Sequence, residues 1–135
     1  MKKHVLMSLK TKFAELIFHR RKKYEFRRAN ISVERGDIVF IYETAPRSMI
    51  TGKFSIGSVI RGAPSTILPL EKEAETRKLC ADYLAGSKAA TAIEIINPVV
   101  FKKARPLTSL GCKIRPPQSY SFIKENHHGL FRDIT

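Results

Sequence analysis

The sequence has few of the residues that carry metal and disulfide chemistry. Its two cysteines, Cys80 and Cys112, stand far apart, with no CxxC pair and no histidine at ligand spacing. This pattern predicts no metal site and no disulfide framework, and it is typical of reduced thiols in an intracellular protein. The adjacent histidines His127 and His128 lie near the C-terminal end, where such pairs are more often solvated than metal-bound. We expect no metal and no cofactor.

Long apolar runs are also missing. No stretch approaches the roughly 18 apolar residues of a membrane helix, and the N-terminus lacks an apolar segment before a cleavage site. We therefore expect a cytoplasmic protein without a membrane partner. No serine or cysteine stands in a nucleophile-elbow motif, so nothing in the sequence supports a nucleophilic triad.

Acidic residues are scarce relative to basic ones. The sequence contains 12 Asp and Glu residues and 25 Lys and Arg residues, which gives a formal net charge of +13 and a pI near 10.1. A surface of this kind attracts polyanions, and nucleic acid is the commonest of them. A basic surface can also keep a protein soluble or attract anionic lipid, so charge alone does not identify the partner.

The remaining composition is that of an ordinary globular domain. The chain has 135 residues, of which 43% are hydrophobic and 27% charged. This is enough to bury a core without metal or disulfide support, and it does not resemble a disordered chain. We predict one domain over residues 1–135, with a core at about 5–123 and a peripheral tail at 124–135. The oligomeric state is not predicted.

The segment 19–28 is the most unusual stretch. Six cations and one carboxylate, Glu25, fall within ten residues, while Tyr24 and Phe26 keep the alternation of a half-buried strand. Period-two geometry then places Tyr24 and Phe26 on one face and Lys23, Glu25 and Arg27 on the other. We expect the carboxylate to look out from a fixed sheet among cations. The structural alternative is a solvated basic edge strand.

The other elements follow from hydrophobic periodicity. Helical spacing predicts a helix at about 11–20 and another from about 65 or 70 to 84. Gly52 and Gly57 mark where the strand at 49–60 should bend or bulge, and Asn97-Pro98 should end the strand at 90–96. Further strands are predicted at 5–9, 38–42 and 99–101, a helical turn at 107–111 and a last short helix near 120–123. This irregular, strand-rich order favours an α+β fold built on a small mixed β-barrel with flanking helices over a doubly wound sheet.

Several local motifs, in this order, carry a resemblance to a known family. They are Leu6-Met7-Ser8-Leu9-Lys10, Lys22-Lys23-Tyr24-Glu25-Phe26-Arg27, Gly36-Asp37, Tyr42-Glu43-Thr44-Ala45-Pro46, the run from Gly52 to Ile60, Ile93-Glu94-Ile95 and Pro117-Gln118-Ser119-Tyr120. Across roughly residues 5–123 the chain resembles ASCH-domain proteins of the PUA-like superfamily. The family pattern is glycine, any residue, lysine, two residues, glutamate, any residue, arginine. Lys22, Glu25 and Arg27 match it, and Arg20 stands where glycine is usual.

The resemblance implies a β-barrel of about six strands with a cleft where this motif faces the loop near Thr44. It also implies RNA binding, since members of the family are thought to bind RNA or to act as RNA-linked regulators of transcription or translation. Some small relatives are reported to be ribonucleases, or amidohydrolases that deacetylate a modified cytidine. Those amidohydrolases are similar to a pattern with threonine where this chain has Glu25, so the hydroxyl of that pattern is missing here.

Three hypotheses therefore stay open. In the first, a basic cleft binds single-stranded or modified RNA: arginine forks hold phosphate, Glu25 accepts a hydrogen bond from a base edge, and an aromatic residue stacks on a base. In the second, Lys22 and Glu25 catalyse hydrolysis of RNA or of acetylated cytidine, so enzyme activity is undecided. In the third, the charges are structural or serve a protein partner. The predicted RNA-binding residues are Lys22, Lys23, Glu25, Arg27, Arg28, Tyr42, Thr44, Gln118 and Ser119.

Overall fold

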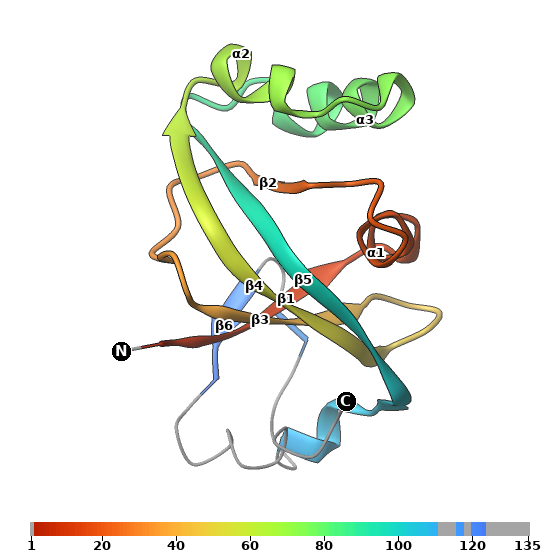
Figure 1. Cartoon of the computed structure of the whole chain (residues 1–135). Helices are drawn as coiled ribbons and strands as arrows, with labels where there is room; N and C mark the ends of the chain where they lie inside the picture. The colour runs from red at the N-terminus through yellow and green to blue at the C-terminus, as the bar shows by residue number, and fades with distance from the viewer. Residues whose placement is uncertain (1, 111–115, 118–119, 124–135) are drawn as a thin grey trace.

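A computed structural model describes residues 2–110, 116–117 and 120–123 (Figure 1). The strands are β1 (His4–Leu9), β2 (Tyr24–Arg27), β3 (Ile38–Glu43), β4 (Met49–Gly62), β5 (Ala90–Arg105) and β6 (Tyr120–Phe122). The helices are α1 (Thr11–Phe18), α2 (Pro64–Ile67) and α3 (Ala74–Leu84), with 3-10 turns η1 (Leu68–Leu70) and η2 (Leu107–Leu110).

The six strands form one curled sheet in the order β2-β5-β4-β3-β1-β6. Only the β1–β3 pair is parallel, which is possible because α1 and β2 lie between these strands in the chain. The long strands β4 and β5 cross the whole molecule, and the sheet curls into a half-barrel around them (Figure 1). The predicted α+β barrel with flanking helices is confirmed.

Three apolar clusters hold the sheet. The first lies inside the curl, where α1 packs Ala14 and Ile17 against Val5, Phe54 and Ile93. The second covers the opposite face of β1 and β3, and the third lies between β2, β5 and the layer of α2 and α3. The helix predicted at about 11–20 thus packs its buried face inside the curl of the sheet.

Both predicted glycine bends are present in β4. The register against β5 shifts next to Gly52 and again between Ile56 and Val59, around Gly57. A side chain at Gly52 would collide with the Val99 carbonyl oxygen and the Phe18 ring. Glycine is therefore required there because backbone and ring approach the strand too closely for a Cβ atom.

Three element predictions are wrong. Asn97 and Pro98 do not end a strand: β5 runs through them with a register shift, and Asn97 adopts a left-handed φ of 49°. The helix predicted from about 65 or 70 to 84 is wrong for the earlier start: residues 64–70 form α2 and η1, where Pro69 cannot donate a backbone hydrogen bond, and only α3 covers 74–84. The segment 120–122 is a strand rather than a helix, since Tyr120 and Phe122 pair with the edge of β1.

Candidate functional site

Strand β2 sorts its side chains as the alternation predicts. Phe26 and Tyr24 join the third apolar cluster, under α2 and α3. Glu25 stands in register with Ile93, whose side chain belongs to the core inside the curl. Glu25 and Arg27 are, however, only 6% and 5% exposed. The expectation that the carboxylate looks out from the sheet is therefore wrong: the curl encloses it.

Arg27 connects two strands that do not pair. Its Nη2 atom lies 3.2 Å from Glu25 Oε2 and donates a hydrogen bond of 3.1 Å to the Ser8 carbonyl oxygen. Ser8 belongs to β1, which is four strands away from β2 in the sheet order. The guanidinium group thus bridges the open side of the half-barrel. Its charge is largely compensated by Glu25 and the carbonyl dipole.

Lys22 precedes β2 and turns towards the helical layer. Its Nζ atom donates a 3.0 Å hydrogen bond to Glu71 Oε1 and lies 4.5 Å from the centre of the Phe26 ring. The two charged side chains are only 2% and 3% exposed. A buried ammonium ion needs such a partner because an isolated charge in an apolar environment is very costly. Lys22–Glu71 is consequently a second buried ion pair beside Glu25–Arg27.

Cys80 on α3 lies beside this second pair, with its Sγ atom 3.9 Å from Lys22 Nζ. Burial raises the pKa of the thiol to about 11; the nearby carboxylates of Glu25 and Glu71 also raise it, and Lys22 lowers it. Both carboxylates are therefore close enough to influence the same thiol electrostatically. At neutral pH the thiol is protonated and is a poor nucleophile.

The remaining cations of the segment are exposed. Lys23 and Arg28 lie at the two ends of β2 and face solvent, with the Arg28 guanidinium carbon 4.9 Å from the Tyr83 ring centre. Arg20, which replaces the usual glycine, has a φ of 60°. Arg21 pairs with Glu73 at 3.1 Å on the surface. Buried charges are thus neutralised, and the cations around them remain in contact with solvent.

The predicted RNA-binding residues outside β2 differ in where the structure places them. Tyr42 is 5% exposed and packs with Leu6 and Phe40, so its ring offers no open face for a base. Thr44 is half-buried and its amide donates to the Leu9 carbonyl, next to the Ser8 carbonyl that Arg27 binds. Gln118 and Ser119 lie outside the described residues. The preceding residue Pro117 accepts a 2.6 Å hydrogen bond from Ser8 Oγ, so Pro117 lies against β1.

Sequence reasoning missed the burial of Asp37, which lies 3.8 Å from Lys3 Nζ, and of two further carboxylates. Glu71 resembled an ordinary acidic residue before a helix, although its neighbours Glu73 and Glu75 are more exposed. Glu43 ends β3, in register with Leu9, and is 6% exposed. Within the described part of the chain, we find no hydrogen bond or ion pair to its side chain. The signal for Glu43 was its place at the end of an otherwise apolar strand.

In residues 2–110, 116–117 and 120–123, no group of three or more His, Cys, Asp or Glu side chains could hold a metal ion. No helix in this part of the chain has the length and apolar character needed to cross a membrane.

The family model described as ASCH domain matches residues 7–103. A search of curated proteins gave no match. Among solved structures, an ASCH protein from Zymomonas mobilis superposes with a TM-score of 0.86 at 21% identity, covering 98% of this chain and 96% of that one. A mutant form of that Zymomonas mobilis protein gives the same TM-score at 22% identity, covering 99% and 100%. The hypothetical protein PH0355 gives a TM-score of 0.51 at 20% identity, covering 73% and 100%. These likenesses establish the fold.

Proposed function

The chain belongs to the ASCH-domain family of PUA-like folds, and on this basis we propose that it binds single-stranded or modified RNA through the charged segment around β2. The observation that carries the proposal is the arrangement of charges there: two buried ion pairs, Lys22–Glu71 and Glu25–Arg27, surrounded by exposed cations. Polar groups fixed in a low-dielectric environment discriminate between ligands, whereas exposed cations attract a polyanion.

The two sets of charges have different roles in this proposal. Lys23 and Arg28 are exposed and hold phosphates, which gives affinity that depends on salt. Glu25 and Arg27 recognise a base edge, because a carboxylate accepts from an exocyclic amine and a guanidinium donates to ring and carbonyl acceptors. Thr44, Gln118 and Ser119 remain candidate polar contacts. Tyr42 is removed from the proposed contacts because its ring packs with Leu6 and Phe40 in the second apolar cluster, on the face of the sheet opposite the core inside the curl.

Single-stranded RNA fits this proposal better than a duplex. An isolated or looped base can enter a site that a paired base cannot, since its Watson–Crick edge is free. The described helices are short, the longest being α3 with 11 residues, and α3 packs on the sheet. None of them is presented as a helix that could enter a major groove.

The test compares binding of a labelled single-stranded RNA by fluorescence anisotropy. Glu25→Gln keeps the shape of the side chain but replaces an acceptor oxygen by a donor, and we expect binding to weaken on the order of tenfold. Arg28→Gln should weaken binding less and make it less dependent on salt. Lys88→Gln, an exposed cation near the end of α3, is the matched control. Unchanged affinity in Glu25→Gln, with the fold intact, would exclude Glu25 from recognition.

A hydrolytic function is the second candidate, favoured by the Lys22–Glu71 pair. A carboxylate and an ammonium group 3.0 Å apart can act as the general base and the general acid of a hydrolysis. For acetylated cytidine, Glu71 would accept a proton from the attacking water, while Lys22 would donate to the acetyl oxygen and pass a proton to the leaving amine. The products are acetate and cytidine. Glu25, whose carboxylate raises the pKa of the Cys80 thiol, would orient the nucleoside.

This candidate is separated from binding by turnover. The protein is incubated with labelled RNA and with acetylated cytidine, and products are followed by chromatography. Activity that disappears in Lys22→Ala, Glu25→Ala and Glu71→Gln, with circular dichroism unchanged, would establish catalysis. If the wild-type protein leaves both substrates intact while it binds RNA, the hydrolytic proposal is excluded and the binding proposal stands.

A further inference from the structure

The strand pair β4–β5 contains a long region without acidic residues. The sequence has no Asp or Glu from Thr44 to Leu70, and none from Ile95 to Lys124. These two segments are far apart in the chain, but β4 and β5 pair along most of their length. The fold therefore places residues 50–56 of the first segment beside residues 95–105 of the second, at the end of the sheet away from α2 and α3 (Figure 1).

The far end of β5 is bulged, and two lysines lie in the bulge. Arg105 is in register with Ile50 and Val100 with Gly52, so residues 101–104 of β5 oppose the single residue Thr51. Phe101 remains in the core at 5% exposure, whereas Lys102 and Lys103 are both exposed. In a regular strand, neighbouring side chains point to opposite faces; a bulge re-aims them. Here it leaves two adjacent cations in water.

Other cations lie around this bulge. Arg47 occupies the loop between β3 and β4, and Lys53 is in register with Val99. We name the set the β4–β5 basic surface, and its members are Arg47, Lys53, Lys102, Lys103 and Arg105. Lys53 is half-buried and the others are exposed. Within the part of the chain that the structure describes, none of the five forms an ion pair or a side-chain hydrogen bond.

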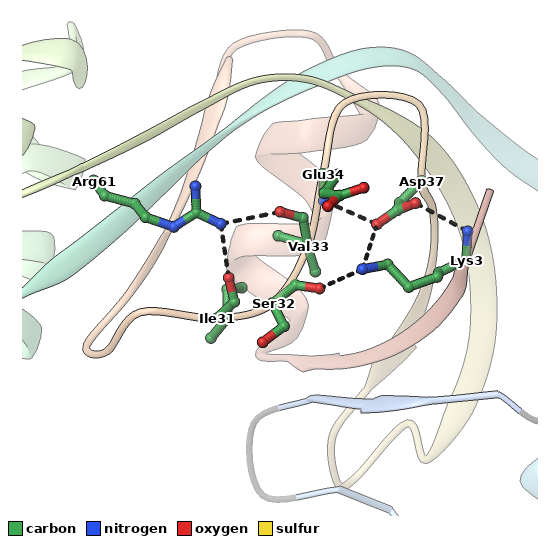
Figure 2. Close-up of polar contacts among 7 residues, drawn as sticks. All are labelled: Lys3, Ile31, Ser32, Val33, Glu34, Asp37 and Arg61. Atoms are coloured by element: carbon green, nitrogen blue, oxygen red, sulfur yellow. Dashed lines mark hydrogen bonds and ion pairs between the residues drawn. The ribbon is translucent and has the colours of Figure 1, made fainter. Parts of the chain in front are cut away.

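Cations at the other end of these strands are used differently. Arg61, near the end of β4, donates through Nη2 to the carbonyl oxygens of Ile31 and Val33, at 2.9 and 3.1 Å (Figure 2). Lys3 donates to the Ser32 carbonyl and lies 3.8 Å from Asp37. These two side chains fasten the loop between β2 and β3 to the sheet. Cations with a structural role in this fold thus donate hydrogen bonds to backbone carbonyl oxygens. In the described residues, the side chains of the β4–β5 basic surface make no such hydrogen bonds.

We infer that the β4–β5 basic surface is a second contact for RNA, which holds the phosphate backbone outside the charged segment of β2. This inference rests on the function proposed above. Lys102 follows Ile93, the residue opposite Glu25, by at most about 30 Å along β5 at roughly 3.3 Å per residue. A nucleoside in the β2 segment cannot reach so far, but an oligonucleotide can.

The length of the RNA therefore becomes the measured variable. Oligonucleotides of about 4 and about 12 nucleotides, which span the usual range of single-strand site sizes, are titrated by anisotropy at several salt concentrations. The surface variant is Lys102→Gln/Lys103→Gln/Arg105→Gln. The control is Lys72→Gln/Lys78→Gln/Lys88→Gln, three exposed lysines on or beside α3. Each triple variant removes three positive charges from a formal net charge of +13.

We expect the surface variant to bind the longer RNA at least about tenfold more weakly. The slope of log affinity against log salt should become shallower by about two, since three phosphates contribute roughly 0.7 each in a single strand. Binding of the shorter RNA should change little, and the control should keep most of the affinity for both. This pattern would assign the effect to position rather than to net charge.

Other outcomes overturn the inference in distinguishable ways. If both triple variants lose the same affinity, only the total charge matters and the surface is rejected, while the proposed RNA binding stands. If the wild-type protein binds neither RNA, the proposed function and this inference fail together. Vesicles containing phosphatidylserine serve as a further arm: binding to vesicles that depends on Lys102, Lys103 and Arg105, without loss of RNA binding in the variant, would reassign the surface to lipid.

Discussion

The two basic regions of this protein treat their charges in opposite ways. Around β2, Lys22 and Arg27 are enclosed, and each lies within 3.2 Å of a carboxylate oxygen. On the β4–β5 basic surface, Lys102, Lys103 and Arg105 are exposed in a sequence segment without any Asp or Glu. Lysine and arginine therefore form buried ion pairs around β2, whereas they form a solvent-exposed cluster of positive charge on the β4–β5 basic surface.

This difference determines what each region can contribute to RNA binding. A buried ion pair gains little net stability, because desolvation offsets the attraction, but it fixes side chains in one geometry. Exposed cations without an ion-pair partner reduce folding stability little, and their side chains are not held in one geometry. They nevertheless attract phosphate over a Debye length of about 10 Å at 0.1 M salt. The fixed side chains around β2 are suited to recognising a base, and the exposed cations of the β4–β5 basic surface are suited to attracting phosphates. Four predictions examine this contrast.

The largest effect should follow from breaking a buried pair. Glu71→Leu leaves the Lys22 ammonium group enclosed without its partner, so we expect the free energy of unfolding to fall by about 3–5 kcal/mol. The double variant Lys22→Met/Glu71→Leu removes both charges at similar volume and should recover most of this loss. Urea denaturation followed by circular dichroism measures all three proteins. A loss below about 1 kcal/mol in Glu71→Leu would mean that water reaches Lys22 and that the pair is not enclosed.

Sequence patterns predicted the elements that depend on local periodicity. The alternation of Tyr24 and Phe26 against Glu25 and Arg27 was sufficient to assign their faces, since side chains in a strand alternate without regard to the rest of the fold. Gly52 was recognised as a bend for the same local reason. Local rules also identified α1, which has one continuous apolar stripe.

Features that depend on distant parts of the chain were not predictable. The burial of Arg27 arises because the sheet curls until β2 faces Ser8 on β1, and no pattern within β2 encodes that closure. The partnership of Lys22 with Glu71 joins residues 49 positions apart. Strand β6 was predicted as a helix because three residues carry too little periodicity, and only the free edge of β1 makes them a strand.

An intermediate effect is expected in the chemistry of Cys80, which reports on the buried region. With a pKa raised to about 11 from an ordinary 9.0, the thiol should react with a thiol reagent at pH 8 about a hundredfold more slowly than a free cysteine. Lys22 lowers this pKa, so Lys22→Met should slow the reaction further. Rates are measured from pH 7 to 10 in a Cys112→Ser background, which leaves a single thiol.

The same shift has a defined sign for stability. Because the folded protein holds the Cys80 proton more tightly than the unfolded chain does, this contribution is complete below about pH 9 and is lost as the pH rises from 9 towards 11. Cys80→Ala should remove that pH dependence, and wild-type unfolding at pH 8 and 10 supplies the comparison. A rate profile for Cys80 with a midpoint near 9 would show that the thiol is not in the enclosed environment described for it.

The smallest effect should come from the open surface itself. In Lys102→Gln/Lys103→Gln/Arg105→Gln, each replaced side chain is exposed and has no ion-pair partner in the described residues, so removing its charge breaks no contact. We expect the free energy of unfolding to change by less than about 0.5 kcal/mol, and any change to be a gain, because repulsion among like charges is relieved. Urea denaturation at low and high salt measures this, and the gain should vanish at high salt as screening removes the repulsion. A loss of several kcal/mol would mean that these cations support the fold as Lys22 and Arg27 do, and the contrast between the two regions would disappear.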